Sequence, residues 1–372
     1  MYGLERVPAE IREILDRYGF DETRFLRECE AVASGRISKE ANLVRGRLQP
    51  PGPRAWVDLP GPEEPEAREW AELGRTALAE GKVGAIILNG GMATRFGGVV
   101  KGVVEALPGR SFLDLKIAGI AGAAAGAGGK VPIYLMNSFA TEEATRLHVA
   151  EHRNFGLSEG DLRFYTQGIS LRLRKNGEIH FDEAGMPSCY GPGHGDCIPF
   201  FRASGHLERF LDGGGRILFL SNVDNLAARL DPIVIGAHLA KGASLTAELA
   251  PKWPGDQGGA PVLVDGALWI VEGFRFPPDF DQDSVPVFNT NTFTVDAEAL
   301  DRDFPLTPCY VEKKVGGAEV VQVETLVGEL TRFLPTFYLK VRRTGKLSRF
   351  FPIKTPEDLQ DGREDLALIC AD

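Results

Sequence analysis

Apolar and polar positions alternate in long blocks along this chain. Continuous apolar runs, typical of strands buried on both faces, occupy residues 83–88, 131–136, 161–167, 216–221 and 244–249. Helical patterns lie between or before them, at residues 65–80, 112–126, 141–155, 201–212 and 231–241. Buried strands that alternate with helices predict a mostly parallel sheet covered by helices on both faces. We therefore expect an α/β fold.

Two short segments interrupt this rhythm with hairpin patterns. Asn176-Gly177 and Asp265-Gly266 each stand between runs of alternating apolar residues, and both dipeptides suit a type I′ turn. They predict antiparallel hairpins added at the rim of the sheet. After Val285 the pattern becomes rich in strands.

The first part of the chain has a different character. Two amphipathic helical patterns cover residues 8–34, and Asp21 is placed to cap the second. The following stretch, 48–67, is rich in proline and predicts a linker without regular structure. We expect three parts: a helical appendage with its linker at 1–78, a main domain at 79–359 and a short tail at 360–372.

Composition and charge exclude several classes of protein. The chain has 372 residues and a formal net charge of −10, which argues against nonspecific nucleic-acid binding. Its five cysteines are scattered without CxxC spacing, which indicates a reducing cytoplasm and no structural zinc. The acidic amphipathic start is unlike a secretion signal, and the apolar segment 117–129 is too short to span a bilayer. We expect a cytoplasmic protein that binds neither membranes nor nucleic acid.

The segment "LNGGMATRFGGVVKG", residues 88–102, directly follows a predicted strand. A glycine-rich turn in this position places backbone N–H groups where anionic oxygens can bind. The spacing fits neither the P-loop nor the dinucleotide fingerprint. Gly90 and Gly91 would let the backbone approach a base and sugar, and Arg95 and Lys101 are candidate cations for a triphosphate. The alternative is an ordinary turn in a chain with 44 glycines.

Seven further segments follow this loop in a fixed order. They are FLDL (112–115), LMNSF (135–139), GHGD (193–196), SNVDNL (221–226), NTNTF (289–293), QVET (322–325) and RFFPIKTPEDL (349–359). In this order the chain resembles the eukaryotic-type UTP–glucose-1-phosphate uridylyltransferases (UDP-glucose pyrophosphorylases), from about Gly81 to Leu359. The resemblance implies a Rossmann-like, glycosyltransferase-A-like nucleotidyltransferase fold, with residues 79–359 as the catalytic domain. It also implies that the chain makes UDP-glucose and pyrophosphate from UTP and glucose 1-phosphate.

This reaction is an in-line attack of a sugar phosphate on the α-phosphorus of UTP, so positioning and charge should supply the catalysis. The resemblance implies that Lys101 and Lys354 contact phosphates, and Arg95 stands where many sugar nucleotidyltransferases carry an arginine. Asp224 is the implied ligand of Mg²⁺, a metal that prefers oxygen ligands. The alternative for Asp224, with Asn222 and Asn225, is that these side chains cap the next helix.

The remaining site residues are also implied by the resemblance. Gln167 would recognise uracil, Met136 would form an apolar wall, and Glu324 would orient the surrounding shell. His194 stands between two glycines, which indicates an exposed ring and a strained backbone. Glu272, Asn289 and Asn291 would form hydrogen bonds with the hydroxyls of the sugar, and turn and strand-edge chemistry is the alternative for the two asparagines. The predicted substrate-binding set is Leu88, Gly90, Gly91, Met136, Gln167, Gly193, His194, Asn222, Glu272, Asn289, Asn291 and Glu324.

The chain departs from the family pattern in two places. Thr94-Arg95-Phe96 is closer to UDP-N-acetylhexosamine pyrophosphorylases, whereas GHGD and SNVDNL favour glucose. A UDP-N-acetylhexosamine or broad UDP-sugar pyrophosphorylase is therefore an alternative, as is a noncatalytic sensor of nucleotide sugars. The resemblance also implies a C-terminal β-helix used in oligomerisation, whereas this sequence ends thirteen residues after Leu359. We expect a monomer or small homo-oligomer that does not use a C-terminal β-helix.

Overall fold

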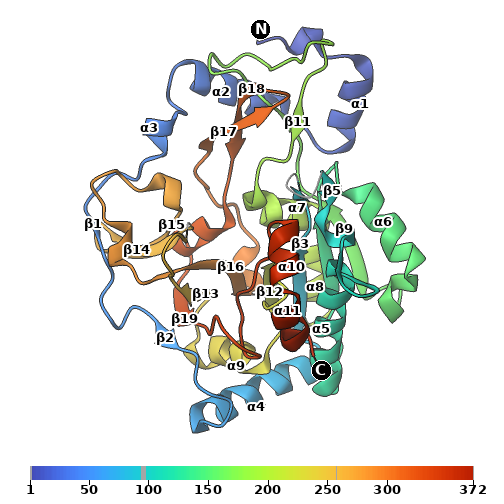
Figure 1. Ribbon diagram of the computed structural model, residues 1–372, viewed down its shortest axis with the longest axis vertical. Helices are drawn as coiled ribbons and strands as arrows, with labels where there is room; N and C mark the ends of the chain where they lie inside the picture. Colours follow the sequence, from blue (N-terminus) through green and yellow to red (C-terminus); the bar gives the residue numbers. More distant parts are fainter. Residues whose placement is uncertain (1, 94–97, 257, 372) are drawn as a thin grey trace.

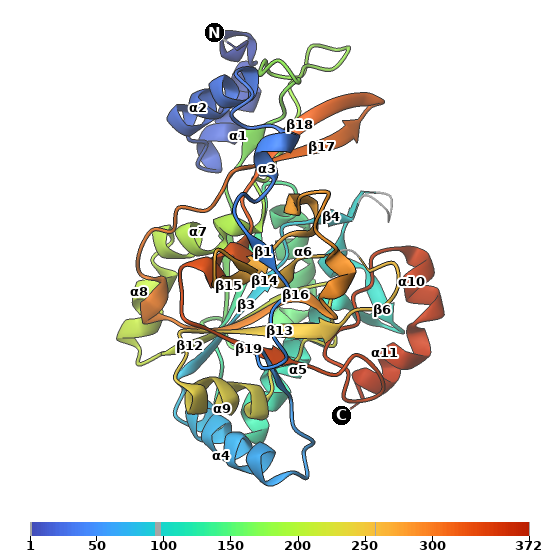
Figure 2. The ribbon, with the colours of Figure 1, turned by 90° about the vertical axis from the view of Figure 1, so that its left-hand side faces the viewer.

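The computed structural model describes residues 2–93, 98–256 and 258–371. Its centre is an eight-stranded sheet in the order β2-β19-β13-β16-β12-β3-β8-β9 (Figures 1 and 2). β16 runs antiparallel to both of its neighbours, and the other neighbouring pairs are parallel. The mostly parallel α/β fold is thus confirmed. In sheet order the strands are Val57–Asp58, Thr336–Lys340, Leu245–Pro251, Val287–Asp296, Ile217–Asn222, Val83–Leu88, Ile133–Asn137 and Leu162–Thr166.

Helices cover both faces of this sheet. Strand β3 sends Ile86 and Leu88 into one hydrophobic core, and Ala85 and Ile87 into the core on the other face. This alternation explains why the strand is apolar at every position, since successive side chains point to opposite faces. The helices of this part are α4 (Pro65–Ala79), α5 (Phe112–Gly126), α6 (Glu142–Glu151), α7 (Cys197–Ala203), α8 (His206–Asp212), α9 (Pro232–Lys241), α10 (Pro356–Asp361) and α11 (Arg363–Ile369).

Two predicted helices differ from the pattern: one is interrupted and the other is shorter. The predicted helix 201–212 is divided into α7 and α8, because Gly205 adopts a left-handed φ of +69°. The predicted helix 141–155 stops at Glu151, because residues 153–155 all have positive φ near 50°. Left-handed residues cannot continue a right-handed helix.

The first helices form a separate layer at one end of the molecule, beside the hairpin of β17 (Cys309–Val315) and β18 (Ala318–Glu324), as both views show (Figures 1 and 2). Asp21 caps α2 by accepting a hydrogen bond from the N–H of Arg24 at 2.9 Å, as predicted. Phe25 of α2 shares a hydrophobic core with Val321 and Val323. The elements of this layer are α1 (Ala9–Arg17), α2 (Glu22–Ala33), α3 (Lys39–Asn42), β10 (Ser170–Leu171) and β11 (Cys189–Tyr190).

The proline-rich segment is more ordered than we predicted. It contains β1 (Leu48–Gln49), which pairs with β14 (Ala260–Val264), and it adds β2 to the edge of the central sheet. Helix α4 then crosses α9 at a position where two glycines allow close approach. A Cβ on Gly74 would lie 1.9 Å from the carbonyl oxygen of Pro232, and one on Gly236 would lie 1.7 Å from that of Trp70. The boundaries at residues 78 and 359 stay a prediction, although α4 and α11 both contribute to cores shared with the sheet.

The two hairpin predictions have different outcomes. Between β14 and β15 (Ala267–Val271), Asp265 and Gly266 have φ of +50° and +86°, which confirms the type I′ turn. At the other hairpin only Gly177, with φ +82°, is left-handed, and Asn176 is not. There the N–H of Gly177 donates to the carbonyl of Arg174 at 2.9 Å, which is the pattern of a type I turn followed by a glycine bulge. The type I′ prediction for Asn176-Gly177 is therefore wrong.

The small strands beside the glycine-rich loop are β4 (Met92–Ala93), β5 (Val99–Val100), β6 (Glu105–Leu107) and β7 (Arg110–Ser111). Across residues 2–93, 98–256 and 258–371, none of the helices has the length and apolar character needed to cross a bilayer.

Candidate active site

The glycine-rich loop begins where β3 ends, and a buried asparagine holds it there. The side chain of Asn89 donates to Asn137 Oδ1 at 2.8 Å and to Thr145 Oγ1 at 2.9 Å. Gly102 packs against the same amide, since a Cβ there would lie 2.5 Å from Asn89 Oδ1. Both ends of the loop thus contact the side chain of Asn89. This residue lies within the motif, but the sequence analysis did not predict it as a site residue.

The predicted substrate-binding residues of this loop differ in exposure to solvent. Leu88 is buried, Gly90 is half-buried and Gly91 is exposed. Arg95 lies outside the residues that the structure describes, so its predicted role stays a prediction. A backbone of small residues beside a buried strand end can approach a planar ligand closely.

Lys101 follows the loop in a single 3₁₀ turn, Lys101–Val103, and is buried. Its Nζ lies 4.8 Å from the centre of the Phe112 ring. Burial lowers the pKa of Lys101 to about 8, while the carboxylates of Asp224 and Asp358 oppose this shift. A cation in this setting gains much from the arrival of anionic phosphates, because little water is present to screen it.

Asp224 comes just after β12, within electrostatic reach of three lysines. Burial raises the pKa of the Asp224 carboxyl, and Lys101, Lys354 and Lys116 oppose the shift. Lys354 reaches this position because the N–H of Ile353 donates to the carbonyl oxygen of Asp224 at 3.1 Å. The structure therefore brings together Lys101, Asp224 and Lys354, which are up to 253 positions apart in the numbering of the chain.

Asp224 does not cap the next helix. Helix α9 begins at Pro232 and is capped by Asp231, whose side chain accepts from the N–H of Ile233 at 2.8 Å. Asn225 instead ties the loop to the C-terminal segment, since its Oδ1 accepts from the N–H of Phe351 at 2.9 Å. The capping alternative is therefore wrong for Asp224.

Lys116 is a buried cation that the sequence analysis missed. It lies in the alanine-rich helix α5, and its Nζ donates to the carbonyls of Asn225 at 2.8 Å and Ala228 at 2.6 Å. Burial lowers the pKa of Lys116 to about 7. These contacts hold the loop after Asp224 in place. The only sequence signal was a lysine within an otherwise apolar helix face.

The candidate uracil residue, Gln167, is enclosed by two glycines. It is buried at the end of β9, and a Cβ on Gly90 would lie 3.0 Å from its Nε2. A Cβ on Gly191 would lie 2.0 Å from the same atom. Met136, also buried, occupies the neighbouring strand β8. The glycine-rich loop and the segment before GHGD therefore meet at the amide of Gln167.

The GHGD turn packs against the QVET segment. Gly193 has a left-handed φ of +95°, and a Cβ there would lie 2.5 Å from the carbonyl oxygen of Thr325. The imidazole Nδ1 of His194 accepts from the N–H of Val327 at 3.0 Å. Glu324 also lies against this turn, because a Cβ on Gly193 would be 3.2 Å from its Cβ.

Our interpretation of His194 as exposed and strained is wrong. The residue is half-buried, and the left-handed conformation falls on Gly193 rather than on His194. Burial lowers the pKa of His194 to about 4, so the ring is neutral at pH 7. Because Nδ1 accepts a hydrogen bond, the proton of the neutral ring is on Nε2, which can donate to a ligand.

The candidate sugar residues gather where β16 passes the end of β12. Asn291 has a left-handed φ of +57°, and its side chain donates to Asn222 Oδ1 at 2.9 Å. A Cβ on Gly328 would lie 3.2 Å from Asn289 Nδ2 and 3.3 Å from Glu272 Oε1. Asparagine tolerates the left-handed region better than most residues, which suits it to this bend.

Among the candidate sugar residues, Glu272 has a strongly shifted pKa. Burial raises the pKa of Glu272 to about 7, and nearby Arg275 opposes the shift. A carboxyl that titrates near neutral pH in a polar cluster is typical of ligand-binding sites.

An ion pair connects the GHGD turn to the N-terminal layer, which the sequence did not predict. Asp196 is buried, and its Oδ1 lies 3.6 Å from Nη1 of Arg24 on α2. Its Oδ2 accepts from the N–H of Gly168 at 3.2 Å. Arg24 thus holds the carboxylate of Asp196, which joins the GHGD turn to Gly168, the residue after Gln167.

Comparison with known proteins identifies the family. The family model described as UTP–glucose-1-phosphate uridylyltransferase matches residues 36–369. The chain belongs to this family. The uridylyltransferase of Musa acuminata is 28% identical over 387 residues, which cover 98% of this chain and 78% of that protein. The uridylyltransferase of Saccharomyces cerevisiae is 30% identical over 307 residues, covering 77% of this chain and 60% of the yeast protein.

Solved structures of UDP-sugar pyrophosphorylases share the fold of this family member. The UDP-glucose pyrophosphorylase V402W mutant from Leishmania major has a TM-score of 0.72 at 21% identity, covering 95% of this chain and 78% of that one. The UDP-N-acetylglucosamine pyrophosphorylase from Trypanosoma brucei has a TM-score of 0.74 at 18% identity, covering 97% and 82%. At these identities the likeness concerns the fold alone, and it does not distinguish between the two sugars.

Proposed function

We propose that this chain is a UTP–glucose-1-phosphate uridylyltransferase that forms UDP-glucose and pyrophosphate with the help of Mg²⁺. The observation that carries the proposal is the position of Lys101 and Lys354 around Asp224, at the carboxyl ends of the sheet strands, in a chain of this family. Open α/β sheets bind their ligands at this edge.

In the reaction, a phosphate oxygen of glucose 1-phosphate attacks the α-phosphorus of UTP. A new P–O bond forms at the α-phosphorus. The bond between the α-phosphorus and the oxygen that bridges to the β-phosphate breaks, and pyrophosphate leaves with that electron pair. No side chain needs to form a covalent bond. The two lysines lower the repulsion between the two anions and stabilise the leaving pyrophosphate. The Nε2–H of His194 can donate to an oxygen of a bound phosphate or sugar.

The residues at Asp224 fit a Mg²⁺ ion. Mg²⁺ usually binds one or two carboxylates together with substrate phosphates. The carboxylate of Asp224 is half-buried and makes no ion pair within 4.0 Å to a residue that the structure describes. Its oxygens can coordinate a cation whose other ligands are phosphates and water. When bound, Mg²⁺ would neutralise phosphate charge next to Lys101.

Glucose is the sugar that we propose, because the matched family model and the curated relatives carry that name. Pyrophosphate release should be measured with UTP and either glucose 1-phosphate or N-acetylglucosamine 1-phosphate. We expect the first to react faster. A faster reaction with the second would favour the UDP-N-acetylhexosamine alternative, and release with neither would favour the sensor.

The affinity for the sugar phosphate should depend on pH through Glu272. Its raised pKa of about 7 means that the carboxyl is mostly protonated below neutral pH and ionised above it. The ionised form accepts hydrogen bonds from sugar hydroxyls, so KM for glucose 1-phosphate should fall as pH rises. Between pH 6 and pH 8 the ionised fraction changes about tenfold, and we expect KM to change by a similar factor.

The sugar phosphate itself titrates near pH 6, so the variant Glu272→Gln is the control. It should retain only the weaker dependence that comes from the substrate. If the pH profiles of KM are the same for both proteins, Glu272 does not contact the sugar.

The ion pair between Arg24 and Asp196 should matter for binding UTP. In Arg24→Ala the buried carboxylate loses its cation, which we expect to loosen the turn beside Gln167 and to raise KM for UTP roughly tenfold. The turnover number should change little, because Lys101 and Lys354 stay in place. Arg24→Lys should restore part of the loss, and Arg27→Ala, an exposed arginine on the same helix, should have no effect. Equal effects of Arg24→Ala and Arg27→Ala would contradict this role.

A further inference from the structure

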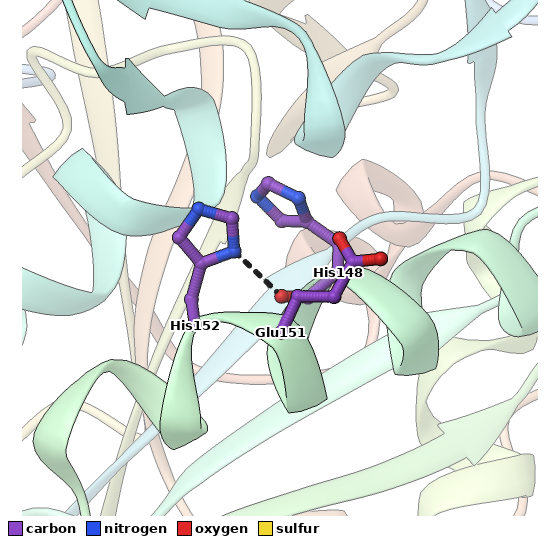
Figure 3. Close-up of side chains that lie close together, drawn as sticks. All are labelled: His148, Glu151 and His152. Carbon is purple, nitrogen blue, oxygen red and sulfur yellow. Dashed lines mark hydrogen bonds between the residues drawn. The ribbon is translucent and has the colours of Figure 1, made fainter.

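A second group of ligand-type side chains lies at the C-terminal end of α6 and on His152, the residue that follows it. His148, Glu151 and His152 each offer one donor atom, and these three atoms all lie within 4.8 Å of one another. Figure 3 shows the three side chains projecting from the same stretch of helix. The spacing i, i+3, i+4 places them on one face. Two histidines four residues apart on a helix are the zinc ligands of several metallopeptidases.

The two imidazoles are already oriented by other groups. His152 Nδ1 lies 2.8 Å from the carbonyl oxygen of His148, so this nitrogen carries the proton and Nε2 keeps its lone pair (Figure 3). His148 Nε2 lies 2.8 Å from Ser111 Oγ, and when this nitrogen donates to the hydroxyl, Nδ1 of that ring keeps its lone pair for a ligand. Metal-binding histidines usually use one ring nitrogen for the metal and the other for such a hydrogen bond.

The place of the cluster at the surface also suits a metal. Glu151 and His152 are exposed, so an ion can reach the site from solvent and both side chains can rotate to close the remaining distance. Two nitrogens and one carboxylate oxygen leave a fourth position for water, as in open zinc sites.

We propose that His148, Glu151 and His152 bind one transition-metal ion of the Zn²⁺ class. Imidazole nitrogen favours Zn²⁺, Co²⁺, Ni²⁺ or Cu²⁺ over Mg²⁺, which prefers oxygen. The site is therefore chemically different from Asp224. Its ligands are histidines and a glutamate, so the scattered cysteines, which led us to expect no structural zinc, do not bear on it.

An ion at this site would be connected to the nucleotide loop. Ser111, the partner of His148, caps α5 by accepting from the N–H of Asp114 at 3.1 Å. The next residue is Phe112, whose ring lies 4.8 Å from Lys101 Nζ. On the same helix, Thr145 accepts from Asn89 at 2.9 Å. Metal binding would thus fix α6 against two elements that position Lys101.

The test is a titration of the full chain, freed of metal by a chelator, with Zn²⁺ in competition with a metal indicator. We expect one Zn²⁺ per chain and a higher midpoint of thermal unfolding when it is bound. His152→Ala and Glu151→Gln should each weaken binding at least about tenfold. Both side chains are exposed, so these variants should fold as the parent does. Glu143→Gln, an exposed acid on the same helix, should bind Zn²⁺ as tightly as the parent.

Two results would overturn the proposal. One is unchanged Zn²⁺ affinity in the double variant His148→Ala/His152→Ala, which would mean that zinc binds elsewhere, for example at cysteines. The other is displacement of Zn²⁺ by Mg²⁺ at the same concentration, which a site with two imidazoles should resist. Neither result depends on whether the chain has uridylyltransferase activity.

Discussion

Replacing Lys101 by alanine should lower the turnover number for UDP-glucose formation by about 10²- to 10³-fold, the usual effect of removing one group that stabilises transition-state charge. Lys101 is buried beside Asp224, where its charge is poorly screened. In the transition state it faces the charge that develops on the phosphates and on the leaving pyrophosphate. UDP-glucose has no pyrophosphate leaving group, so its affinity should fall much less. Steady-state kinetics and calorimetric binding of UDP-glucose measure the two quantities.

The control for Lys101→Ala is Lys314→Ala, which removes an exposed lysine from the β17–β18 hairpin. It should leave both turnover and binding unchanged. Equal losses of turnover and UDP-glucose affinity in Lys101→Ala would mean that the lysine binds the ground state and the transition state alike. Its assignment as a catalytic cation would then be wrong.

Replacing Arg349 by methionine should destabilise the protein by about 3–5 kcal/mol, the usual cost of breaking a buried ion pair. Arg349 and Glu248 are both fully buried, and two hydrogen bonds of 2.7 Å and 2.6 Å join them. Without the guanidinium, the Glu248 carboxylate would be left unpaired beneath the sheet. Chemical denaturation followed by fluorescence measures the free energy of unfolding.

The double variant Arg349→Met/Glu248→Met separates loss of the charge pair from loss of packing. It should recover much of the stability, because no fully buried charge is left unpaired; Asp231, which also pairs with Arg349 at 3.2 Å, is partly exposed. Arg75→Ala, which breaks an exposed pair with Glu72, should have little effect. If Arg349→Met costs no more than Arg75→Ala, the buried pair does not anchor the segment that carries Lys354.

Strands β3, β8 and β12 of the central sheet could be predicted because they are apolar at nearly every position. The six residues Val83–Leu88 are all buried and carry no polar side chain, as expected of a strand that is covered on both faces. The edges could not be predicted in the same way. β1 and β2 are two residues long each, and their positions depend on partners more than 200 residues away in sequence. The break between α7 and α8 comes from Gly205. Glycine also occurs inside helices, so the sequence alone does not show that the helix is interrupted there.

The proximity of Lys101, Asp224 and Lys354 was predictable, because each of them stands in a motif. The site was not predictable where a residue acts on a distant partner. Lys116 contacts a loop 109 residues later in sequence, and Arg24 contacts a carboxylate 172 positions away. Neither stands in a recognisable motif. Only the folded chain shows that these two cations support the Asp224 loop and the GHGD turn.

The most direct test of this account is pyrophosphate release by the purified chain supplied with UTP, glucose 1-phosphate and Mg²⁺. We expect one pyrophosphate for each UDP-glucose formed, and no reaction after chelation of the metal. If no pyrophosphate appears with glucose 1-phosphate or any other hexose 1-phosphate, then Lys101, Lys354 and Asp224 do not form a nucleotidyltransferase site.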